Sequence, residues 1–331
     1  MNVTTIDHLE LYVGDLARVA AHFRDGFGFR SLGHNGPAAD AAGARSMLLG
    51  AGGIRLLLTQ GLAPDHPASR YVERHGDGVA CLAMRTDDAG ADATLAGPGS
   101  LTHRLVGAGH RLERAGEVGG GIAPVPAGPD NRFLETIDHL ALCVPAGQLD
   151  PTVRHYQDAF GFGQIFEERV ELGGQAMDSK VVQSPSREVT LTIVSPDPTG
   201  EAGQLDDFLR SHAGAGVQHV AFGTRDIATA VDTLRGRGVR FLTTPDGYYD
   251  GIERRLGAVS RPVAALRAGN ILVDRDHWGE MFQIFTESPF PRRTCFFELI
   301  ERRGALTFGS NNIKALYEAN ERARAATVAQ A

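Results

Sequence analysis

The chain has 331 residues, 42% hydrophobic and 22% charged, with a formal net charge of −7; this fits one large or two ordinary globular domains and excludes wholesale disorder. The acidic balance argues against a nucleic-acid partner and against an anionic membrane surface, because both attract a basic face. We expect no membrane span and no secretion signal, since no apolar run reaches about 18 residues and the N-terminus lacks a basic region followed by an apolar one.

Three short segments of the first half recur in the same order in the second half. The pairs are 5–9 and 136–140, 27–29 and 160–162, and 76–79 and 214–217. Ordered matches of this kind indicate a duplication. We therefore expect an N-terminal domain over 1–130 and a C-terminal domain over 131–331, with the Gly- and Pro-rich segment 119–130 as the linker between them.

Hydrophobic periodicity predicts the elements of the second half. In chain order they are a strand at 137–144, a helix at 152–160, strands at 176–183, 189–194 and 217–223, a helix that begins after Asp226, strands at 239–243, 270–274 and 280–286, and a C-terminal helix at 311–325. A strand, a helix and then several strands, repeated four times, is an α+β pattern. Sheets of this kind can curl around a central cavity.

Two of the 12 histidines differ from the others because they lie in apolar strands. His139 and His219 each lie near the start of the first strand of a unit, and in a pair of related units such positions face each other across a shared cavity. The alternative is a pair of hydrogen-bonded core histidines. Six other histidines lie in polar surroundings, and we expect them at the surface: His22, His75, His103, His110, His155 and His212.

Glu298 lies inside the apolar run 294–300. A carboxylate there is costly unless it is paired or metal-bound, or unless the strand is an exposed edge. Two imidazoles and one carboxylate form the ligand set of non-haem Fe(II) oxygenases, which leaves positions for substrate and O2, although zinc accepts the same ligands.

The first half contains only part of this set. His8 matches His139, but Cys81 stands where His219 is expected, and we find no counterpart of Glu298. We therefore expect His8 to be structural. The cysteines (Cys81, Cys143 and Cys295) show no CxxC spacing, which favours a reducing cytoplasm.

Four segments carry a family likeness: GVQHVA at 216–221, FQIFT at 282–286, FFELIER at 296–302 and FGSNNIKAL at 308–316. With them the chain resembles the 4-hydroxyphenylpyruvate dioxygenase family of the vicinal-oxygen-chelate superfamily, over nearly its whole length. The resemblance places Fe(II) on His139, His219 and Glu298. It also implies tandem βαβββ units in two open barrels, a structural one and a catalytic one, with iron in the C-terminal barrel.

The family has two activities on 4-hydroxyphenylpyruvate, and both consume O2 and release CO2. Dioxygenases attack the ring and form homogentisate, whereas synthases hydroxylate the benzylic carbon and form 4-hydroxymandelate. Dioxygenases usually carry Pro and Asn at the positions of Thr192 and Val194, and Phe at that of Ile313. The resemblance therefore implies a 4-hydroxymandelate synthase; the alternatives are a homogentisate-forming dioxygenase or a related 2-oxo acid oxygenase.

The resemblance also suggests which side chains contact the substrate, with no catalytic group beyond the metal ligands. They are the polar Ser179, Thr192, Gln283 and Asn312 and the apolar Val194, Phe297, Phe308 and Ile313. The expected partners are a small 2-oxo acid and O2, and a homodimer stays open. Three rivals stay open as well: a metal-free binding module, which would lack the full ligand set; a ring-cleaving dioxygenase, which would add a histidine base; and a zinc isomerase or lyase, which would favour more carboxylates.

Overall fold

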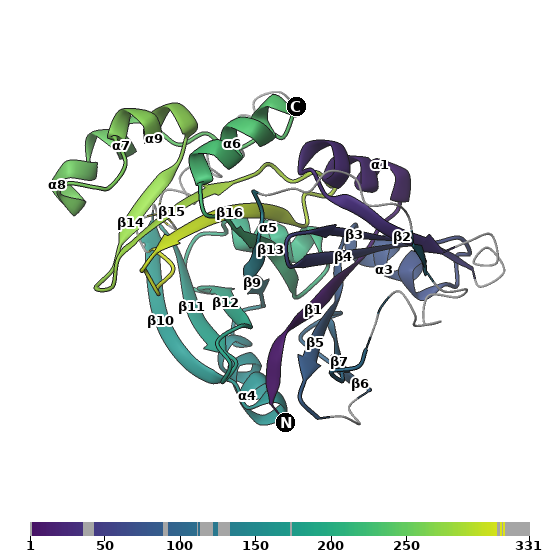
Figure 1. Ribbon diagram of the computed structural model, residues 1–331. Helices are drawn as coiled ribbons and strands as arrows, with labels where there is room; N and C mark the ends of the chain where they lie inside the picture. The colour runs from purple at the N-terminus through teal and green to yellow at the C-terminus, as the bar shows by residue number, and fades with distance from the viewer. Residues whose placement is uncertain are drawn as a thin grey trace.

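The protein forms two eight-stranded sheets, one from each half of the chain (Figure 1). The computed structural model describes residues 2–35, 43–88, 92–110, 112, 122–124, 133–172, 174–309, 312 and 314. The first sheet has the order β6-β7-β5-β1-β4-β3-β2-β8 and the second the order β10-β11-β12-β9-β13-β16-β15-β14. The predicted α+β class with curled sheets is confirmed.

The strands of the first sheet are β1 (Val3–Tyr12), β2 (Arg30–Asn35), β3 (Ala44–Ala51), β4 (Ile54–Gly61), β5 (Gly78–Thr86), β6 (Ala93–Ala96), β7 (Thr102–Val106) and β8 (Ile122–Pro124). Those of the second are β9 (Thr136–Cys143), β10 (Gly163–Leu172), β11 (Gln175–Gln183), β12 (Thr190–Pro196), β13 (Gly216–Gly223), β14 (Leu272–Arg275), β15 (Glu280–Phe285) and β16 (Phe296–Arg303). The helical segments are α1 (Leu16–Ala21), η1 (His22–Gly26), α3 (Pro67–His75), α4 (Leu149–Phe160), α5 (Gln204–Ser211), α6 (Ile227–Gly236), α7 (Asp246–Asp250), α8 (Ile252–Leu256) and α9 (Val263–Gly269).

The same strand pairing recurs at the centre of both sheets. β1 pairs antiparallel with β5 and parallel with β4, as β9 pairs with β13 and β12. β5 then pairs in parallel with β7, as β13 does with β16. The repeat in the sequence is therefore a repeat of topology, and it places His8 and His139 at matching positions of β1 and β9.

Local chemistry sets the ends of the helices over the second sheet. α4 buries Val153, Tyr156 and Phe160, and it ends at Gly161, whose φ of 70° is a conformation that glycine adopts readily. The side chain of Asp226 accepts a hydrogen bond from the backbone of Thr229, so α6 has the predicted N-cap. Figure 1 shows α6, α7 and α9 along one side of the second sheet, near β14, β15 and β16.

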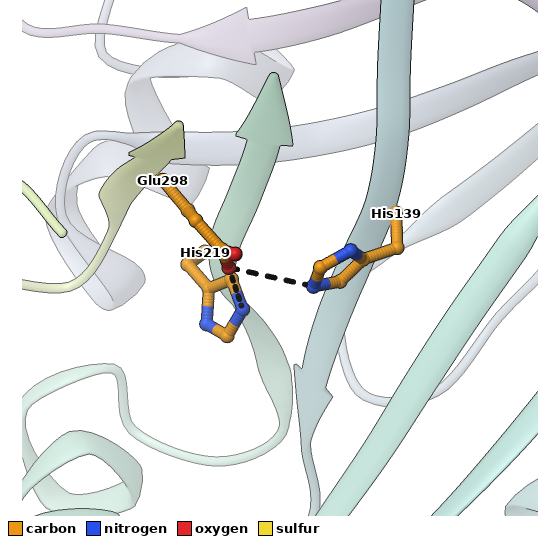
Figure 2. Close-up of side chains that lie close together, drawn as sticks. All are labelled: His139, His219 and Glu298. Carbon is orange, nitrogen blue, oxygen red and sulfur yellow. Dashed lines mark ion pairs between the residues drawn. The ribbon is translucent and has the colours of Figure 1, made fainter. Parts of the chain in front are cut away.

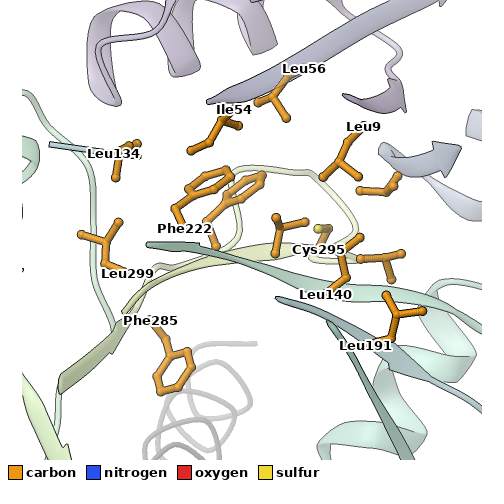
Figure 3. Close-up of a cluster of buried hydrophobic side chains, with 14 of the residues drawn as sticks. Leu9, Ile54, Leu56, Leu134, Leu140, Leu191, Phe222, Phe285, Cys295 and Leu299 are labelled. Carbon is orange, nitrogen blue, oxygen red and sulfur yellow. The ribbon is translucent and has the colours of Figure 1, made fainter. Parts of the chain in front are cut away.

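A shared apolar core joins the two halves (Figure 3). Leu9 and Leu56 of the first half and Leu140 and Phe222 of the second belong to it and are fully buried. Aromatic rings from both halves meet there as well: Phe23, Phe27, Phe29, Phe222, Phe290 and Phe297. The two sheets thus pack against each other through this apolar core, and the opposite, inner face of each sheet lies largely outside it.

Several sequence predictions were wrong in detail. The predicted strand 239–243 contributes one isolated bridge, from Phe241 to Thr286, before α7 begins. The predicted linker contains β8, which pairs with β2, and β10 had not been predicted. The predicted C-terminal helix lies outside the described residues except for Asn312 and Lys314.

Three histidines expected at the surface are buried: His75, His103 and His212 are 7%, 0% and 1% exposed. Their polar neighbours in sequence were a poor guide, because tertiary packing buries the rings, and each ring makes at least one hydrogen bond within the fold. His75 Nδ1 lies 2.6 Å from the carbonyl oxygen of His212, and His103 Nε2 lies 3.1 Å from the hydroxyl of Tyr156.

Among the described residues, no helix is long and apolar enough to span a membrane.

Candidate metal centre

The three predicted metal ligands converge inside the second sheet (Figure 2). His139, His219 and Glu298 each offer one ligand atom, and these atoms lie within 4.8 Å of one another. Oε2 of Glu298 is 3.5 Å from Nε2 of His139 and 3.5 Å from Nε2 of His219. Two imidazole nitrogens and one carboxylate oxygen therefore face a common point.

Strand register explains this convergence. β9 and β16 flank β13, and Ala221 of β13 pairs with His139 on one side and with Glu298 on the other. His219 lies two residues before Ala221, so its side chain points to the same face of the sheet. Three distant segments of sequence thus place their side chains on one inner surface.

Burial gives the cluster the electrostatics of a cation site. His139 and Glu298 are 3% and 1% exposed. Burial raises the pKa of Glu298 to about 7 and holds that of His219 well below its ordinary value, so the imidazole of His219 is neutral and can donate a lone pair. A buried carboxylate beside the neutral imidazole of His219 is costly without a cation, and a divalent metal removes that cost.

Each imidazole is oriented through its other ring nitrogen. Nδ1 of His139 lies 2.8 Å from Oδ1 of Asp138, and Arg302 donates to both oxygens of Asp138 at 2.8 and 2.9 Å. Burial opposes ionisation of Asp138, but the hydrogen bonds from His139 and Arg302 hold its pKa well below its ordinary value. Nδ1 of His219 lies 3.1 Å from Oε1 of Gln218. Partners of this kind fix the tautomer that leaves Nε2 free for a metal.

The carboxylate is oriented as well. Gln283 donates from Nε2 to Oε1 of Glu298 at 2.8 Å, and Asn312 donates to Oε1 of Gln283 at 2.7 Å. Oε2 of Glu298, the oxygen that faces the imidazoles, is not the one that Gln283 holds. The carboxylate therefore presents one fixed oxygen to the common point.

A pocket opens directly in front of the three ligands and encloses about 630 Å³ of atom-free space, counting its mouth. Its apolar walls are Phe166, Met177, Val194, Leu205, Phe285 and Phe308, and its other polar side chains are Ser179, Thr192, Gln204, Gln218 and Gln283. The pocket thus combines an apolar body, which suits an aromatic ring, with a few polar groups near the metal ligands.

Five of the eight side chains predicted to contact the substrate line this pocket: Ser179, Thr192, Val194, Gln283 and Phe308. The ring of Phe308 lies edge-on to His139 at 5.3 Å, and the guanidinium of Arg302 lies over the Phe308 ring at 5.2 Å. The hydroxyl of Thr192 donates to the backbone oxygen of Leu140 at 3.4 Å, so its proton is used within the sheet.

The other three predicted contacts differ. Phe297 was wrongly expected in the cavity wall: side chains alternate along β16, so the neighbour of Glu298 faces the opposite side, where its ring stacks on Phe222. Asn312 does not line the pocket and lies behind Gln283. Ile313 lies outside the described residues.

Several pocket residues were missed from the sequence. Alternation could have found Met177 and Phe285, which lie two residues from Ser179 and Gln283 on the same strands. Gln204 and Leu205 belong to α5, which the periodicity did not predict. Phe166 belongs to β10, which was likewise missed.

Comparisons with known proteins agree with the fold. The family model described as the Glyoxalase/Bleomycin resistance protein/Dioxygenase superfamily matches residues 5–95 and 136–284 of this chain. The probable 4-hydroxyphenylpyruvate dioxygenase 2 of Aspergillus fumigatus is 31% identical over 96% of this chain and 93% of its own length. The 4-hydroxyphenylpyruvate dioxygenase of Dictyostelium discoideum is 28% identical over 96% and 97%.

Solved structures give a further likeness. A triple mutant of 4-hydroxymandelate synthase from Streptomyces coelicolor superposes with a TM-score of 0.88 and 40% identity, over 97% of this chain and 99% of that one. A fusion protein of a xylose isomerase-like TIM barrel and a 4-hydroxyphenylpyruvate dioxygenase has a TM-score of 0.75 and 24% identity, over 96% of this chain and 52% of the fusion. The second match bears on the fold alone.

Proposed function

We propose a function from one premise: this chain belongs to the 4-hydroxyphenylpyruvate dioxygenase family of the Glyoxalase/Bleomycin resistance protein/Dioxygenase superfamily. The protein is proposed to be an Fe(II)-dependent 4-hydroxymandelate synthase. It would convert 4-hydroxyphenylpyruvate and O2 into 4-hydroxymandelate and CO2. The observation that carries this proposal is the convergence of His139, His219 and Glu298 on one point, in front of an apolar pocket.

The ligand set fits Fe(II), because two imidazoles and one carboxylate form the facial triad of non-haem Fe(II) oxygenases. When bound, iron supplies open positions for a chelating 2-oxo acid and for O2. His139, His219 and Glu298 would hold it. The zinc isomerase or lyase considered from the sequence would favour further carboxylates, and Glu298 is the only carboxylate among the described residues that line the pocket.

The surrounding residues prepare these ligands. Asp138 keeps the Nδ1 proton of His139 away from the metal side, and Gln283 keeps one oxygen of Glu298 occupied. Neither role requires a proton to move during turnover, so the chain supplies position and charge rather than acid–base chemistry. The 2-oxo acid is its own source of electrons, and no separate 2-oxoglutarate is needed.

The pocket walls are proposed to bind the aromatic ring. Phe166, Phe285 and Phe308 offer apolar surface, and aromatic pairs prefer offset or edge-on contact. Ser179 and Gln283, which line the pocket, are proposed as polar contacts to the substrate.

Benzylic rather than ring hydroxylation follows from Val194 and Ile313. Val194 lines the pocket and offers no hydrogen bond to hold a phenol, whereas dioxygenases usually carry Asn there. Ile313 replaces the usual Phe, so less side-chain volume would press on the ring. The ring could then tilt and bring the benzylic carbon to the reactive position, where a displacement of about 1 Å changes rates strongly.

Three observations support this proposal over the alternatives. The likeness to the synthase structure is 40% identical and covers both chains almost completely, whereas the similar curated dioxygenases are 31% and 28% identical. A metal-free binding module would not need three ligands converging within 4.8 Å. A ring-cleaving dioxygenase would place a further histidine in the pocket, and its described lining contains only His139 and His219.

The test is anaerobic Fe(II) loading followed by addition of 4-hydroxyphenylpyruvate and O2, with O2 uptake and CO2 release measured. We expect equal amounts of O2 consumed and CO2 released without 2-oxoglutarate. A strict requirement for 2-oxoglutarate would contradict the proposal. In the double variant Val194→Asn with Ile313→Phe, we expect part of the product to shift to ring-hydroxylated species, at a lower rate.

We place the enzyme in the cytoplasm, in keeping with three unpaired, buried cysteines.

A further inference from the structure

A line of buried hydrogen bonds runs from helix α7 to the metal-binding carboxylate. The hydroxyl of Tyr248 donates to Oδ1 of Asn312 at 2.7 Å. Nδ2 of Asn312 donates to Oε1 of Gln283 at 2.7 Å. Nε2 of Gln283 then donates to Oε1 of Glu298 at 2.8 Å. Four residues from four separate parts of the second half are thus connected end to end.

Burial gives this line a fixed direction. Tyr248, Asn312, Gln283 and Glu298 are 8%, 0%, 3% and 1% exposed, so water does not substitute freely for any partner. If the amide of Asn312 turned over, its NH2 group would face the Tyr248 hydroxyl and its oxygen would face the oxygen of Gln283. Gln283 would then have to turn as well and direct an oxygen at the carboxylate of Glu298.

The far end of the line is itself anchored. The backbone nitrogen of Val273 donates to the hydroxyl oxygen of Tyr248 at 2.8 Å, and the carbonyl of Val273 lies 2.7 Å from the same hydroxyl. β14 pairs with β15, the strand that carries Gln283. The Tyr248 oxygen is therefore held at a set distance from the amides, and its single proton is shared between two acceptors, the carbonyl oxygen of Val273 and Oδ1 of Asn312.

We propose that Tyr248 is a positioning residue of the metal centre, and that it acts through Asn312 and Gln283 on the orientation of Glu298. By donating to Oδ1 of Asn312, its hydroxyl stabilises the amide orientations in which Asn312 donates to Gln283 and Gln283 donates to Oε1 of Glu298. These orientations leave Oε2 of Glu298 directed at the imidazoles. Tyr248 does not line the pocket and touches neither substrate nor metal ligand. The inference rests on the metal assignment made under the proposed function.

A purely structural role for Tyr248 predicts something different. The hydroxyl would then serve only to hold α7 against β14 through Val273. Its removal would lower the unfolding temperature and leave the affinity of the folded protein for metal unchanged. Metal affinity, measured apart from turnover, therefore separates the two roles.

Tyr249 provides a matched control. It is the next residue of α7, it is 2% exposed, and its ring meets that of Tyr248 edge-on at 5.2 Å. Its hydroxyl is not part of the line to Glu298. Tyr249→Phe is thus the same chemical change in the same helix, without the proposed connection.

The experiment titrates apoprotein with Co(II) under anaerobic conditions and follows the absorption of the bound metal. Loss of a group that orients a metal ligand typically weakens binding about 10- to 100-fold. We expect that range for Asn312→Asp, which keeps an acceptor for Tyr248 but removes the donor to Gln283. For Tyr248→Phe, one step further away, we expect about a 3- to 10-fold loss. Tyr249→Phe should bind as the unmodified protein does.

The double variant tests whether the two residues act as one line. Once Asn312 can no longer donate to Gln283, the hydroxyl of Tyr248 can no longer affect the orientation of Gln283. The double variant Tyr248→Phe with Asn312→Asp should therefore bind Co(II) with the affinity of Asn312→Asp alone. Equal affinities of Tyr248→Phe and Tyr249→Phe, or fully additive losses in the double variant, would overturn the inference. If Tyr248→Phe does not fold, unchanged affinity in Asn312→Asp would overturn it.

His139→Ala separates this inference from the proposed function. If the unmodified protein binds no Co(II), or if His139→Ala binds it normally, the metal assignment itself is wrong and the inference fails with it. If His139→Ala loses metal while Tyr248→Phe and Asn312→Asp do not, the metal assignment stands and only the positioning role is wrong.

Discussion

The two halves share a frame of strands and differ in what they place inside it. Ala141 pairs with His219 in the second sheet, as Glu10 pairs with Cys81 in the first. Ala221 pairs with Glu298, and the matching pair of the first half is Ala83 with Arg104. A thiol and a guanidinium therefore occupy the places of an imidazole and a carboxylate.

One part of the site is present in both halves. Nδ1 of His8 lies 2.7 Å from Oδ1 of Asp7, and Asp7 pairs with Arg85, much as Asp138 holds His139 and pairs with Arg302. An oriented, buried histidine is therefore not sufficient evidence for a metal ligand.

The inner surface of the first half is also filled. Leu112 is fully buried and packs with Leu48 and Leu57. Leu57 pairs with Glu10 as Thr192 pairs with Ala141, so an apolar cluster occupies the place that the pocket takes in the second half. The second half therefore differs from the first in two features, the complete ligand set and the open space in front of it.

The largest expected difference between the two halves is the effect of replacing the matching histidines, His139 and His8. His139→Ala should abolish turnover and strongly weaken iron retention, because one of three ligands is lost. His8→Ala should leave the iron content unchanged, since its half lacks the partner ligands. Iron content after gel filtration and O2 uptake check both variants. Normal iron in His139→Ala, or loss of iron in His8→Ala, would contradict the assignment of the two halves.

A smaller effect is expected at the acidic partners. Asp138→Asn should weaken metal binding about 10- to 100-fold, because a neutral amide no longer fixes the Nδ1 proton of His139. Asp7→Asn removes the corresponding group from His8 and should lower only the unfolding temperature. Metal titration of both variants, with thermal unfolding alongside, checks this. Equal metal affinities in the two variants would show that Asp138 does not orient a ligand.

The smallest effect concerns the histidines that join the halves. Burial lowers the pKa of His212 to about 4, from an ordinary value of 6.5. The unfolded imidazole takes up a proton near pH 6.5 and the folded one only near pH 4, so stability is lost as the pH falls between these values. The slope for one such group is at most about 1.4 kcal/mol per pH unit.

Urea unfolding at pH 7.5 and pH 5.5 measures this effect. His212→Gln removes the titrating ring, and the difference in the free energy of unfolding between the two pH values should then shrink. His277→Gln is a control, since His277 is exposed. An unchanged pH dependence in His212→Gln would mean that His212 does not carry it.

The sequence was sufficient where a pattern depends on near neighbours or on the repeat. Alternation predicted the strands around His139 and His219, and the repeat matched His8 with His139. Glu298 was found because a carboxylate in an apolar run needs a partner. Phe297 was misplaced because composition alone does not say which face of a strand a residue occupies.

Other features depend on contacts between distant segments. Arg104 was not recognised as the counterpart of Glu298, because only strand register makes the two equivalent. The link from Tyr248 to Gln283 joins residues that no local pattern relates. His212 was wrongly expected at the surface, because its burial depends on packing against α3 of the other half, which no local pattern predicts.

Product identity tests the central claim most directly. The unmodified protein, loaded with Fe(II), is supplied with 4-hydroxyphenylpyruvate and O2, and the products are separated by chromatography and identified by mass. We expect 4-hydroxymandelate as the main product, formed in the same amount as CO2. Homogentisate as the main product would contradict the synthase assignment and place the chain with the ring-hydroxylating dioxygenases.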